Sequence, residues 1–519
     1  MHPTRHAQTR PDHPALIMAG SGTTVTFAQM EARANRVAHL LRARGLQAGD
    51  VFAVLLENGP LYFDLFWGMQ RSGCLMVPVP TRLTAPEIAY LLADSGAKLL
   101  VTQALFDPLI PALHEAQPDL AILRTGTDPA ADTKSFDIAL SVMPDQPIAD
   151  PSVGAPMLYS SGTTGQPKGV YPAPPASPDV EAPTPLLGLA TMGTGMPSDG
   201  SIVYLSPAPL YHAAPLAWAT TVQRLGGTVV VMEKFDPEAA LAAIERFAVT
   251  DSQWVPTHFV RMLKLPEAVR SRYDLSSHQR AIHAAAPCPV AIKRAMIDWW
   301  GPILLEYYAG SEGIGMTLLN SEQWLAHPGS VGPAIYGTVH VCGPDGAELG
   351  PDEDGLIYFE NPVLPSYHND PEKTAKALHA KGWMTLGDIG HLDADGYLYL
   401  TDRQSHMIIS GGVNIYPQEV ENLLIAHPKV MDAAVIGVPE PDLGEQVTAV
   451  VQPVEEGALE GAGADALETE LRAYLDGQLS HIKMPRRYVF RPDLPREANG
   501  KLYKRALRDE FAAEATNTT

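Results

Sequence analysis

The sequence predicts an α/β fold: a large N-terminal domain of mostly parallel αβ units with a small β-rich subdomain, followed by a small α+β C-terminal domain. Three observations lead to this prediction. Helix-period segments alternate with short apolar runs between residues 27 and 308, as in helices that cover a parallel sheet. Short strands separated by Asp-Gly and Gly-Pro turns fill 337–400. The residues after 405 contain enough strands and helices to fold as a separate unit.

The first αβ unit shows the repeating pattern. Residues 27–45 space their apolar side chains like one face of a helix, and Gly45 ends the run. The apolar run 51–58 then has the composition of a buried strand. The same alternation resumes at 225–260 and at 282–308.

The C-terminal part has its own order of elements. Residues 407–417 suggest two short strands, 417–428 an amphipathic helix, and 466–479 a second helix. We therefore expect an N-terminal domain 1–401 with its β-rich part at 330–401, a connecting segment 402–405, and a C-terminal domain 406–519. The segment 172–185 has six prolines, so we expect an extended loop there.

Composition limits the class of protein. The 519 residues have a net charge of −22, which argues against a general nucleic-acid binder because such a protein needs a basic face. The three cysteines form neither a disulfide framework nor a CxxC metal site and fit a reducing compartment. We see no signal peptide and no run of 18 apolar residues. The expectation is a soluble cytoplasmic protein without integral membrane association; a homodimer stays open.

The most informative stretch is LYSSGTTGQPKGV at 158–170, which combines glycines, hydroxyl side chains and Lys168. Backbone N–H groups, hydroxyls and a lysine together form an anion cradle suited to polyphosphate. The loop is not a Walker A motif, because Lys168 follows Pro167 rather than glycine. The alternative is a flexible turn rich in Gly, Ser and Thr.

This loop resembles the AMP-binding signature of adenylate-forming enzymes, which include acyl- and aryl-CoA synthetases, luciferases and stand-alone adenylation domains. Six further segments resemble the other motifs of that family, in order along the chain. They are SPAPLYHAAP at 206–215, HAAAPCP at 283–289, EYYAGSEG at 306–313, GWMTLGDIGHLDADGYLYLTDR at 382–403, ISGGVNIYPQEVE at 409–421 and PREANGK at 495–501. The resemblance covers nearly the whole chain and is closest to catabolic fatty-acyl, aryl or alicyclic-acid CoA ligases.

The resemblance implies a reaction in two halves with ATP, Mg²⁺ and CoA. Lys501 would bridge the acid and the α-phosphate, Glu312 and Thr163 would hold the metal, and His212 beside Tyr211 would gate the acyl side. These four residues, Lys501, Glu312, His212 and Thr163, are the expected catalytic residues.

Other matched residues would contact the nucleotide or CoA. Asp388 would bind both ribose hydroxyls, because a carboxylate accepts two hydrogen bonds, and Gly411 with Gly412 would let the pantetheine arm pass. The expected cofactor-binding residues are Ser160, Ser161, Gly162, Thr164, Gly165, Lys168, Ala285, Ala286, Pro287, Tyr307, Tyr308, Ala309, Gly310, Ser311, Asp388, Arg403, Gly411 and Gly412.

Some residues depart from the family pattern or lie outside it. Ala284-Ala285-Ala286-Pro287 stands where Gly-Gly-Ala-Pro is common, and Ser405 stands where the hinge of the mobile C-terminal domain is usually Asp or Lys. We expect only solvation for Lys504 and Arg505, and a hairpin turn at Asp393–Asp395.

The function that these features favour is an AMP-forming acyl-CoA synthetase acting on an apolar carboxylic acid. We expect an apolar acyl pocket lined by the segments 207–216, 254–260, 283–288 and 310–318, which contain Trp254, Phe259, Met316 and Leu318 and few charges. The alternative is a stand-alone adenylation enzyme that loads a carrier protein, although 206–215 has no Asp to pair with an amino-acid amine. A luciferase-like oxygenase and an inactive binding module are further alternatives.

Overall fold

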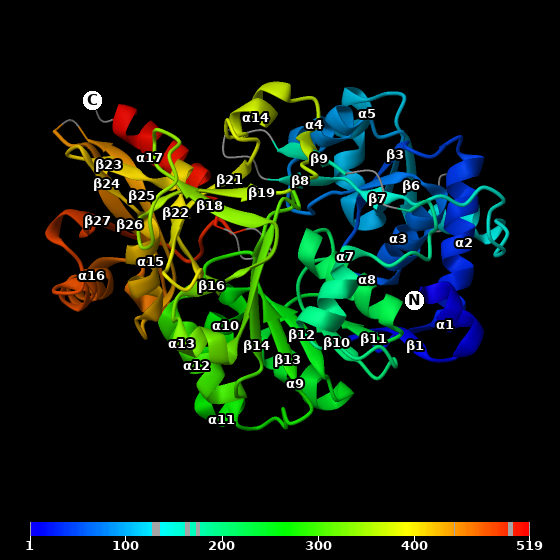
Figure 1. The fold of residues 1–519 in the computed structure, drawn as a ribbon, viewed down its shortest axis with the longest axis horizontal. Helices are drawn as coiled ribbons and strands as arrows, with labels where there is room; N and C mark the ends of the chain where they lie inside the picture. Colours follow the sequence, from blue (N-terminus) through cyan, green and yellow to red (C-terminus); the bar gives the residue numbers. More distant parts are fainter. Residues whose placement is uncertain are drawn as a thin grey trace. The chain divides into compact units, whose positions relative to one another are not determined.

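The computed structural model describes residues 2–126, 135–160, 167–172, 177–440, 442–496 and 502–517. The chain divides into two compact units. Figure 1 labels many of their helices and strands. Unit 1 consists of Met1–Gln253, Asp274–Arg280 and Pro365–Ala375, and unit 2 of Trp254–Tyr273, Ala281–Leu364 and Lys376–Thr519. Each unit is described by itself.

Unit 1 is built from strands that alternate with helices. Its strands are β1 (Pro14–Met18), β2 (Thr24–Thr26), β3 (Val51–Leu55), β4 (Leu75–Pro78), β5 (Leu99–Gln103), β6 (Ala121–Thr125), β7 (Ala155–Pro156), β8 (Leu158–Ser160), β9 (Lys168–Tyr171), β10 (Val203–Ser206), β11 (Thr228–Val231), β12 (Asp251–Trp254) and β20 (Ser366–Tyr367). Its helices are α1 (Pro3–Thr9), α2 (Phe27–Ala43), α3 (Pro60–Ser72), α4 (Ala85–Ser95), α5 (Ile110–Ala116), α6 (Phe136–Ser141), α7 (Pro185–Gly188), α8 (Ala213–Leu225), α9 (Pro237–Phe247) and α14 (Pro371–Lys376).

A five-stranded parallel sheet, in the order β6-β5-β3-β4-β7, forms one core of unit 1. Alternate residues of β3, such as Ala53 and Leu55, pack with Ile88 and Leu91 of α4 and with Leu113 of α5. All five residues of β3 are buried, as expected for a parallel strand covered on both faces.

A second set of strands in unit 1 pairs β10 in parallel with β11 and β12, and β11 in parallel with β1. A separate antiparallel sheet has the order β20-β9-β8.

Helix α2 begins with a capping box between Thr26 and Gln29, which satisfies free N–H groups at the helix start. The helix predicted at 27–45 is therefore confirmed.

Unit 2 contains the rest of the regular structure. Its strands are β13 (Arg280–His283), β14 (Leu304–Ala309), β15 (Met316–Asn320), β16 (Ser330–Gly332), β17 (Ala334–Tyr336), β18 (Thr338–Cys342), β19 (Gly355–Glu360), β21 (Met384–Leu392), β22 (Leu398–Arg403), β23 (Ile408–Ser410), β24 (Val413–Ile415), β25 (Val430–Glu440), β26 (Gly444–Pro453) and β27 (Arg487–Phe490). Its helices are α10 (Pro256–Leu263), α11 (Glu267–Arg270), α12 (Val290–Trp300), α13 (Ser321–Ala326), α15 (Pro417–Ala426), α16 (Gly461–Leu475) and α17 (Lys504–Asn517).

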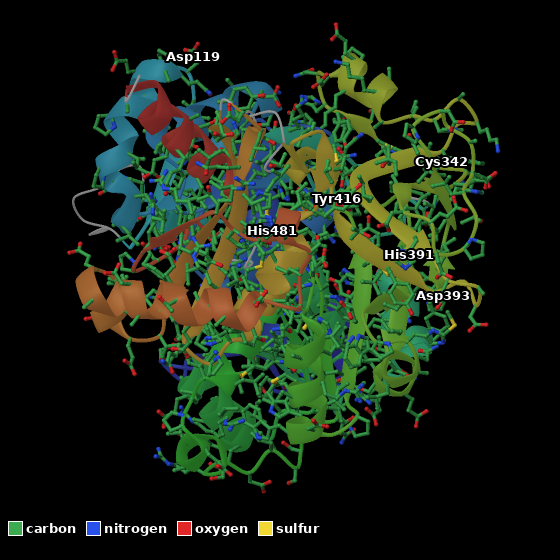
Figure 2. The ribbon with its side chains drawn as sticks, turned by 90° about the vertical axis from the view of Figure 1, so that its left-hand side faces the viewer. Asp119, Cys342, His391, Asp393, Tyr416 and His481 are labelled. Carbon is green, nitrogen blue, oxygen red and sulfur yellow. The ribbon has the colours of Figure 1, made fainter. Side chains whose placement is uncertain are left out.

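Three groups of strands position the site residues of unit 2. Strand β13 pairs in parallel with β14, which pairs with β15 in the antiparallel sense. A five-stranded antiparallel sheet has the order β16-β22-β21-β19-β18, so the β-rich segment expected after 337 is present. Asp393, labelled in Figure 2, lies in the turn between β21 and β22 and accepts the N–H groups of Asp395 and Tyr397, as predicted for a hairpin turn.

The C-terminal sheet pairs β24, β23, β26 and β25, and β27 lies parallel to β26. Leu507 and Phe511 of α17 pack with Ala434, Ile436 and Val450 of this sheet. The predicted α/β fold class is thus confirmed, whereas the domain boundary at 402–405 stays a prediction. Among the described residues, no helix has the length and apolar character needed to span a membrane.

Candidate functional site

Strands β8 and β9 hold the two ends of the predicted phosphate loop. Ser160, at the end of β8, is paired in register with Lys168, at the start of β9. Ser161, Gly162, Thr163, Thr164 and Gly165 lie outside the described residues, and so does Lys501. The roles predicted for these six residues stay predictions.

Lys168 lies opposite an acidic partner that the sequence motifs did not reveal. Its Nζ is 2.8 Å from Asp370 Oδ2, and Asp370 also accepts the N–H of Lys373 in α14. The Lys168 ammonium, followed by this N–H, holds the pKa of Asp370 below its usual range. A short motif around Asp370, an Asp followed by the N1 proline Pro371, is typical of a helix start, but it gives no sign of a lysine 202 residues away.

Asp94 of α4 ties the same hairpin to the segment that contains β20. Its Oδ2 accepts the hydroxyl proton of Tyr159 in β8 at 2.6 Å, and its backbone oxygen lies 3.0 Å from His368 Nε2. His368 also donates its backbone N–H to Gly169 of β9. The base of the phosphate hairpin is therefore fixed by side chains from two distant segments.

The predicted adenine wall, Ala285, Ala286 and Pro287, leaves the end of β13. Ala285 has φ +78°, in the left-handed region that favours glycine. An alanine in this conformation is strained. The sequence indicates the position, because Ala285 stands where the family motif Gly-Gly-Ala-Pro has glycine.

The best-defined polar cluster of unit 2 joins Tyr308, Asp388 and Arg403. The Tyr308 hydroxyl donates to Asp388 Oδ2 at 2.6 Å, and Arg403 Nε lies 3.1 Å from Asp388 Oδ1. Asp388 and Arg403 are direct partners across the antiparallel pair β21–β22. Sequence reasoning named all three residues, and the structure brings them together.

Burial sets the electrostatics of this cluster. Burial, followed by the adjacent Asp388 carboxylate, raises the pKa of Tyr308 well above its usual value. Burial opposes the positive charge of Arg403, but the carboxylates of Asp388 and Glu312 outweigh it and raise the pKa of Arg403. Because Glu312 acts on both groups, it lies within electrostatic reach of the cluster.

Thr163 and Glu312 are the two residues predicted to bind the metal, and of these the structure describes Glu312. It follows Tyr307, Ala309, Gly310 and Ser311 in the segment at the end of β14, and a Cβ added to Gly310 would meet its carboxylate at 2.7 Å. Among the described residues, no group of three or more His, Cys, Asp or Glu side chains could hold a metal ion. A single carboxylate fits Mg²⁺ bound mainly through substrate phosphates.

His212 is the N-cap residue of α8, and its ring centroid lies 4.4 Å from that of Tyr211. Both residues belong to unit 1, and the predicted gating role is not tested by this placement. Of the residues expected to line the acyl pocket, Trp254 at the end of β12 and Phe259 of α10 are fully buried.

Gly411 and Gly412 form the two-residue turn between β23 and β24. Their φ values are +56° and +79°, as a tight hairpin turn requires. A Cβ added to Gly412 would meet no atom within 4 Å, so the space beside it is open among the described residues. An open backbone stretch of this kind suits a close ligand approach.

The flank of the Lys501 segment corrects one prediction. Lys504 is 5% exposed, and its Nζ lies 2.7 Å from Glu421 Oε1, so the expectation that it is only solvated is wrong. Arg505 is 43% exposed, and its Nε lies 3.3 Å from Oδ2 of Asp509, one helical turn away. The apolar side chains of α17 bury its inner face against β25, and this carries Lys504 inward.

Comparison with known proteins identifies a family and several relatives that match nearly the whole chain. The sequence profile of the AMP-binding enzyme family matches residues 3–368, and that of the AMP-binding enzyme C-terminal domain matches 419–501. A feruloyl-CoA synthase of an Amycolatopsis species is 35% identical over 525 residues, which cover 98% of each protein. The fatty acid–[acyl-carrier-protein] ligase ScoC of Streptomyces coeruleorubidus is 32% identical over 523 residues, which cover 98% of this chain and 95% of ScoC.

A solved structure shows the same fold over the whole chain. The crystal structure of ATP-bound MatB from Rhodopseudomonas palustris superposes with a TM-score of 0.78 and 29% sequence identity, covering 99% of both chains. The family profile matches well over half of the sequence, and the relatives align from end to end. The chain therefore belongs to the AMP-binding enzyme family.

Proposed function

We propose that this protein is an AMP-forming carboxylic acid–CoA ligase. In the first half-reaction an oxygen of the substrate carboxylate attacks the α-phosphate of ATP, the bond to the β-phosphate breaks, and pyrophosphate leaves. In the second, the thiolate of CoA attacks the acyl carbon of the acyl-adenylate, and AMP leaves. Chemistry of this kind requires positioning and charge stabilisation from the protein.

The cluster of Tyr308, Asp388 and Arg403 is the observation that carries the proposal. Asp388 presents two carboxylate oxygens, which suit the paired hydroxyls of a ribose. Arg403 lies beside it with a charge that suits a phosphate. A nucleotide that binds here would replace the Tyr308 contact on Asp388 or share the carboxylate with it.

The remaining roles are proposals that rest on the family resemblance. Lys168, Thr164 and the glycines of the hairpin would bind the phosphates, and Lys501 would stabilise the negative charge that develops between acid and α-phosphate. Glu312 and Thr163 would hold Mg²⁺, which neutralises phosphate charge when bound. Gly411 and Gly412 would border the path of the CoA thiol, and 402–405 would be the hinge between domains 1–401 and 406–519.

The substrate that we propose is an apolar acid. The named substrates of two relatives, ferulate and a fatty acid, both have extended apolar parts. The relation to ScoC also supports a second candidate, transfer of the acyl group to a carrier protein instead of CoA. The two candidates share the adenylating half-reaction and differ in the thiol acceptor.

The test is pyrophosphate release over a panel of aryl, medium-chain, long-chain and alicyclic acids, each with CoA, with an acyl carrier protein, or with neither. The proposal predicts an acyl-CoA product by mass spectrometry and turnover that depends on CoA. Acylation of the carrier protein alone would favour the second candidate. Absence of pyrophosphate release with every acid, together with absence of ATP binding, would contradict both.

A further inference from the structure

A buried ion pair involves strand β14 of unit 2, two residues before Tyr308 of the polar cluster with Asp388 and Arg403. Lys293 of α12 is 1% exposed, and its Nζ lies 2.5 Å from Oε2 of Glu306, which is 5% exposed on β14. The ring of Trp324 faces the Lys293 ammonium, with 5.0 Å between Nζ and the ring centroid. Neither member of the pair was singled out by the sequence motifs.

His283 completes the cluster from the neighbouring strand. It is the last residue of β13 and the direct register partner of Glu306, and its Nε2 lies 3.7 Å from Glu306 Oε2. Within the described part of the chain, neither ring nitrogen of His283 has a hydrogen-bond partner. Burial, reinforced by the Lys293 charge, holds the pKa of His283 well below its usual value, so the ring is neutral. The thiol of Cys288 also lies within electrostatic reach of Glu306 and Lys293.

The pair lies beside the ends of β13 and β14, which lead into the two segments predicted to bind the nucleoside. Glu306 immediately precedes Tyr307 and Tyr308, and Tyr308 donates its hydroxyl to Asp388. His283 immediately precedes Ala284, after which Ala285 adopts its left-handed conformation. Lys293 thus connects α12 to the strand end that positions Tyr308, next to the strand end that leads to the predicted adenine wall.

Stability alone is a poor explanation for such a pair. Moving two charges out of water is costly, and apolar residues of similar volume often replace a buried ion pair without loss of stability. An ion pair differs from apolar packing in that it fixes the two groups at one distance and in one direction. A fixed distance and direction are useful where two backbone segments have to keep one relative position. The ends of β13 and β14 are such segments if both contact the nucleoside.

We propose that Lys293 and Glu306 are positioning residues for the nucleoside part of ATP. The pair holds β14 against α12, and through the paired residue His283 it holds β13, so that Tyr308 and the Ala284–Pro287 segment stay in binding geometry. This inference rests on the proposed function, because it takes the cluster around Asp388 to be the nucleoside site. Displacing a positioned group by about 1 Å can cost on the order of 10²-fold in rate.

The experiment compares nucleotide binding with stability. Calorimetry with ATP, AMP and inorganic triphosphate is carried out on the full chain and on three variants, together with thermal unfolding. The variants are Lys293→Met, the apolar double variant Lys293→Met/Glu306→Leu, and the control Lys429→Met, which removes an exposed lysine from its pair with Glu470. Because binding is measured directly, the identity of the acid does not affect the result.

We expect the double variant to unfold at nearly the wild-type temperature but to bind ATP and AMP at least about tenfold more weakly, with unchanged affinity for inorganic triphosphate. The control should match wild type throughout. Wild-type AMP affinity in the double variant would overturn the inference, because the pair would then be structural only. If wild type binds neither ATP nor AMP, the proposed function itself fails and the inference fails with it.

A second readout applies if the double variant does not fold. In Lys293→Met the buried Glu306 lacks its countercharge, and burial already raises the pKa of this carboxyl. We expect the ratio of AMP affinity at about pH 6 to that at about pH 8 to be higher for Lys293→Met than for wild type, because protonation of Glu306 restores neutrality in the variant. The AMP phosphate titrates at about pH 6, but this affects both proteins alike. Identical affinities of this variant and wild type at both pH values would overturn the inference.

Discussion

Lys504 and Glu421 form a buried ion pair, with 2.7 Å between Nζ and Oε1 and with side chains that are 5% and 4% exposed. The same Glu421 oxygen accepts the backbone N–H of Val435 in β25. A second, partly buried pair joins Arg496 to Asp432 of β25. Arg496 and Leu502 are bridged in the antiparallel sense, so the two pairs flank both ends of the segment that contains Lys501.

The substitution Lys504→Met should destabilise the fold strongly. It leaves the buried Glu421 carboxylate without its countercharge, and loss of one partner of a buried pair costs about 3–5 kcal/mol in the free energy of unfolding. Chemical unfolding measures this loss. Arg505→Ala, at the neighbouring exposed position, should change stability by no more than about 0.5 kcal/mol. Equal effects of the two substitutions would show that Lys504 is not buried in solution.

The substitution Asp370→Asn should release Lys168 for a phosphate. The pair is partly exposed, with side chains 16% and 31% exposed, so we expect little change in the melting temperature. If Lys168 binds phosphate, removal of the competing carboxylate should lower the KM for ATP a few-fold. Steady-state kinetics over a range of ATP concentrations measures this change, and Lys168→Met should raise the same KM. A higher KM in Asp370→Asn would indicate instead that Asp370 holds Lys168 in its working position.

The substitution Ala285→Gly should stabilise the protein. At φ +78° the Cβ of alanine is in steric conflict with the backbone, and glycine avoids this conflict. Glycine also makes the unfolded chain more flexible, which lowers stability by a smaller amount. We therefore expect the free energy of unfolding to rise by up to about 1 kcal/mol. Thermal unfolding is the measurement. Ala286→Gly is the matched control because Ala286 does not have a positive φ, and it should destabilise by roughly 0.5–1 kcal/mol. A loss of stability in Ala285→Gly would contradict the left-handed conformation.

Local patterns in the sequence were sufficient for much of the fold. The apolar spacing of 27–45 and the Thr26–Gln29 box are properties of neighbouring residues, and helix α2 follows them. Tyr308, Asp388 and Arg403 were each predicted to contact the nucleotide because each lies in a recognisable motif, and the structure joins them in one cluster. Such motifs identify each residue separately. Because all three are expected to bind the same nucleotide, they are also expected to lie close together.

Partners from distant segments without a motif were not predictable. Asp370 is 202 residues from Lys168, and Asp94 is 274 residues from His368. Whether a charged side chain such as Lys504 is solvated or buried depends on which face its helix packs against the sheet. The sequence around it, ANGKLYKR, has no apolar pattern strong enough to reveal that face.

Acidification below neutral pH should destabilise the protein through its buried histidines. Burial lowers the pKa of His278 to about 3, and its Nε2 lies 2.6 Å from Ser252 Oγ inside unit 1. Burial also lowers the pKa of His258 to about 3 in unit 2. In unfolded chains these rings take up a proton near their usual pKa of about 6.5. Between about pH 6.5 and about pH 3 the unfolded state therefore binds more protons than the folded state, and stability falls as the pH falls.

The size of this effect follows from the same difference in bound protons. Each such histidine removes about 1.4 kcal/mol of stability per pH unit below its unfolded pKa, so about 1 kcal/mol each is lost at about pH 5.5. His278→Gln, which keeps a polar group near Ser252, should reduce the loss between about pH 7 and about pH 5.5 by this amount, as measured by chemical unfolding at both pH values. His481→Gln, at an exposed histidine labelled in Figure 2, is the control. A slope in His278→Gln as steep as in wild type would mean that His278 is protonated in the folded protein.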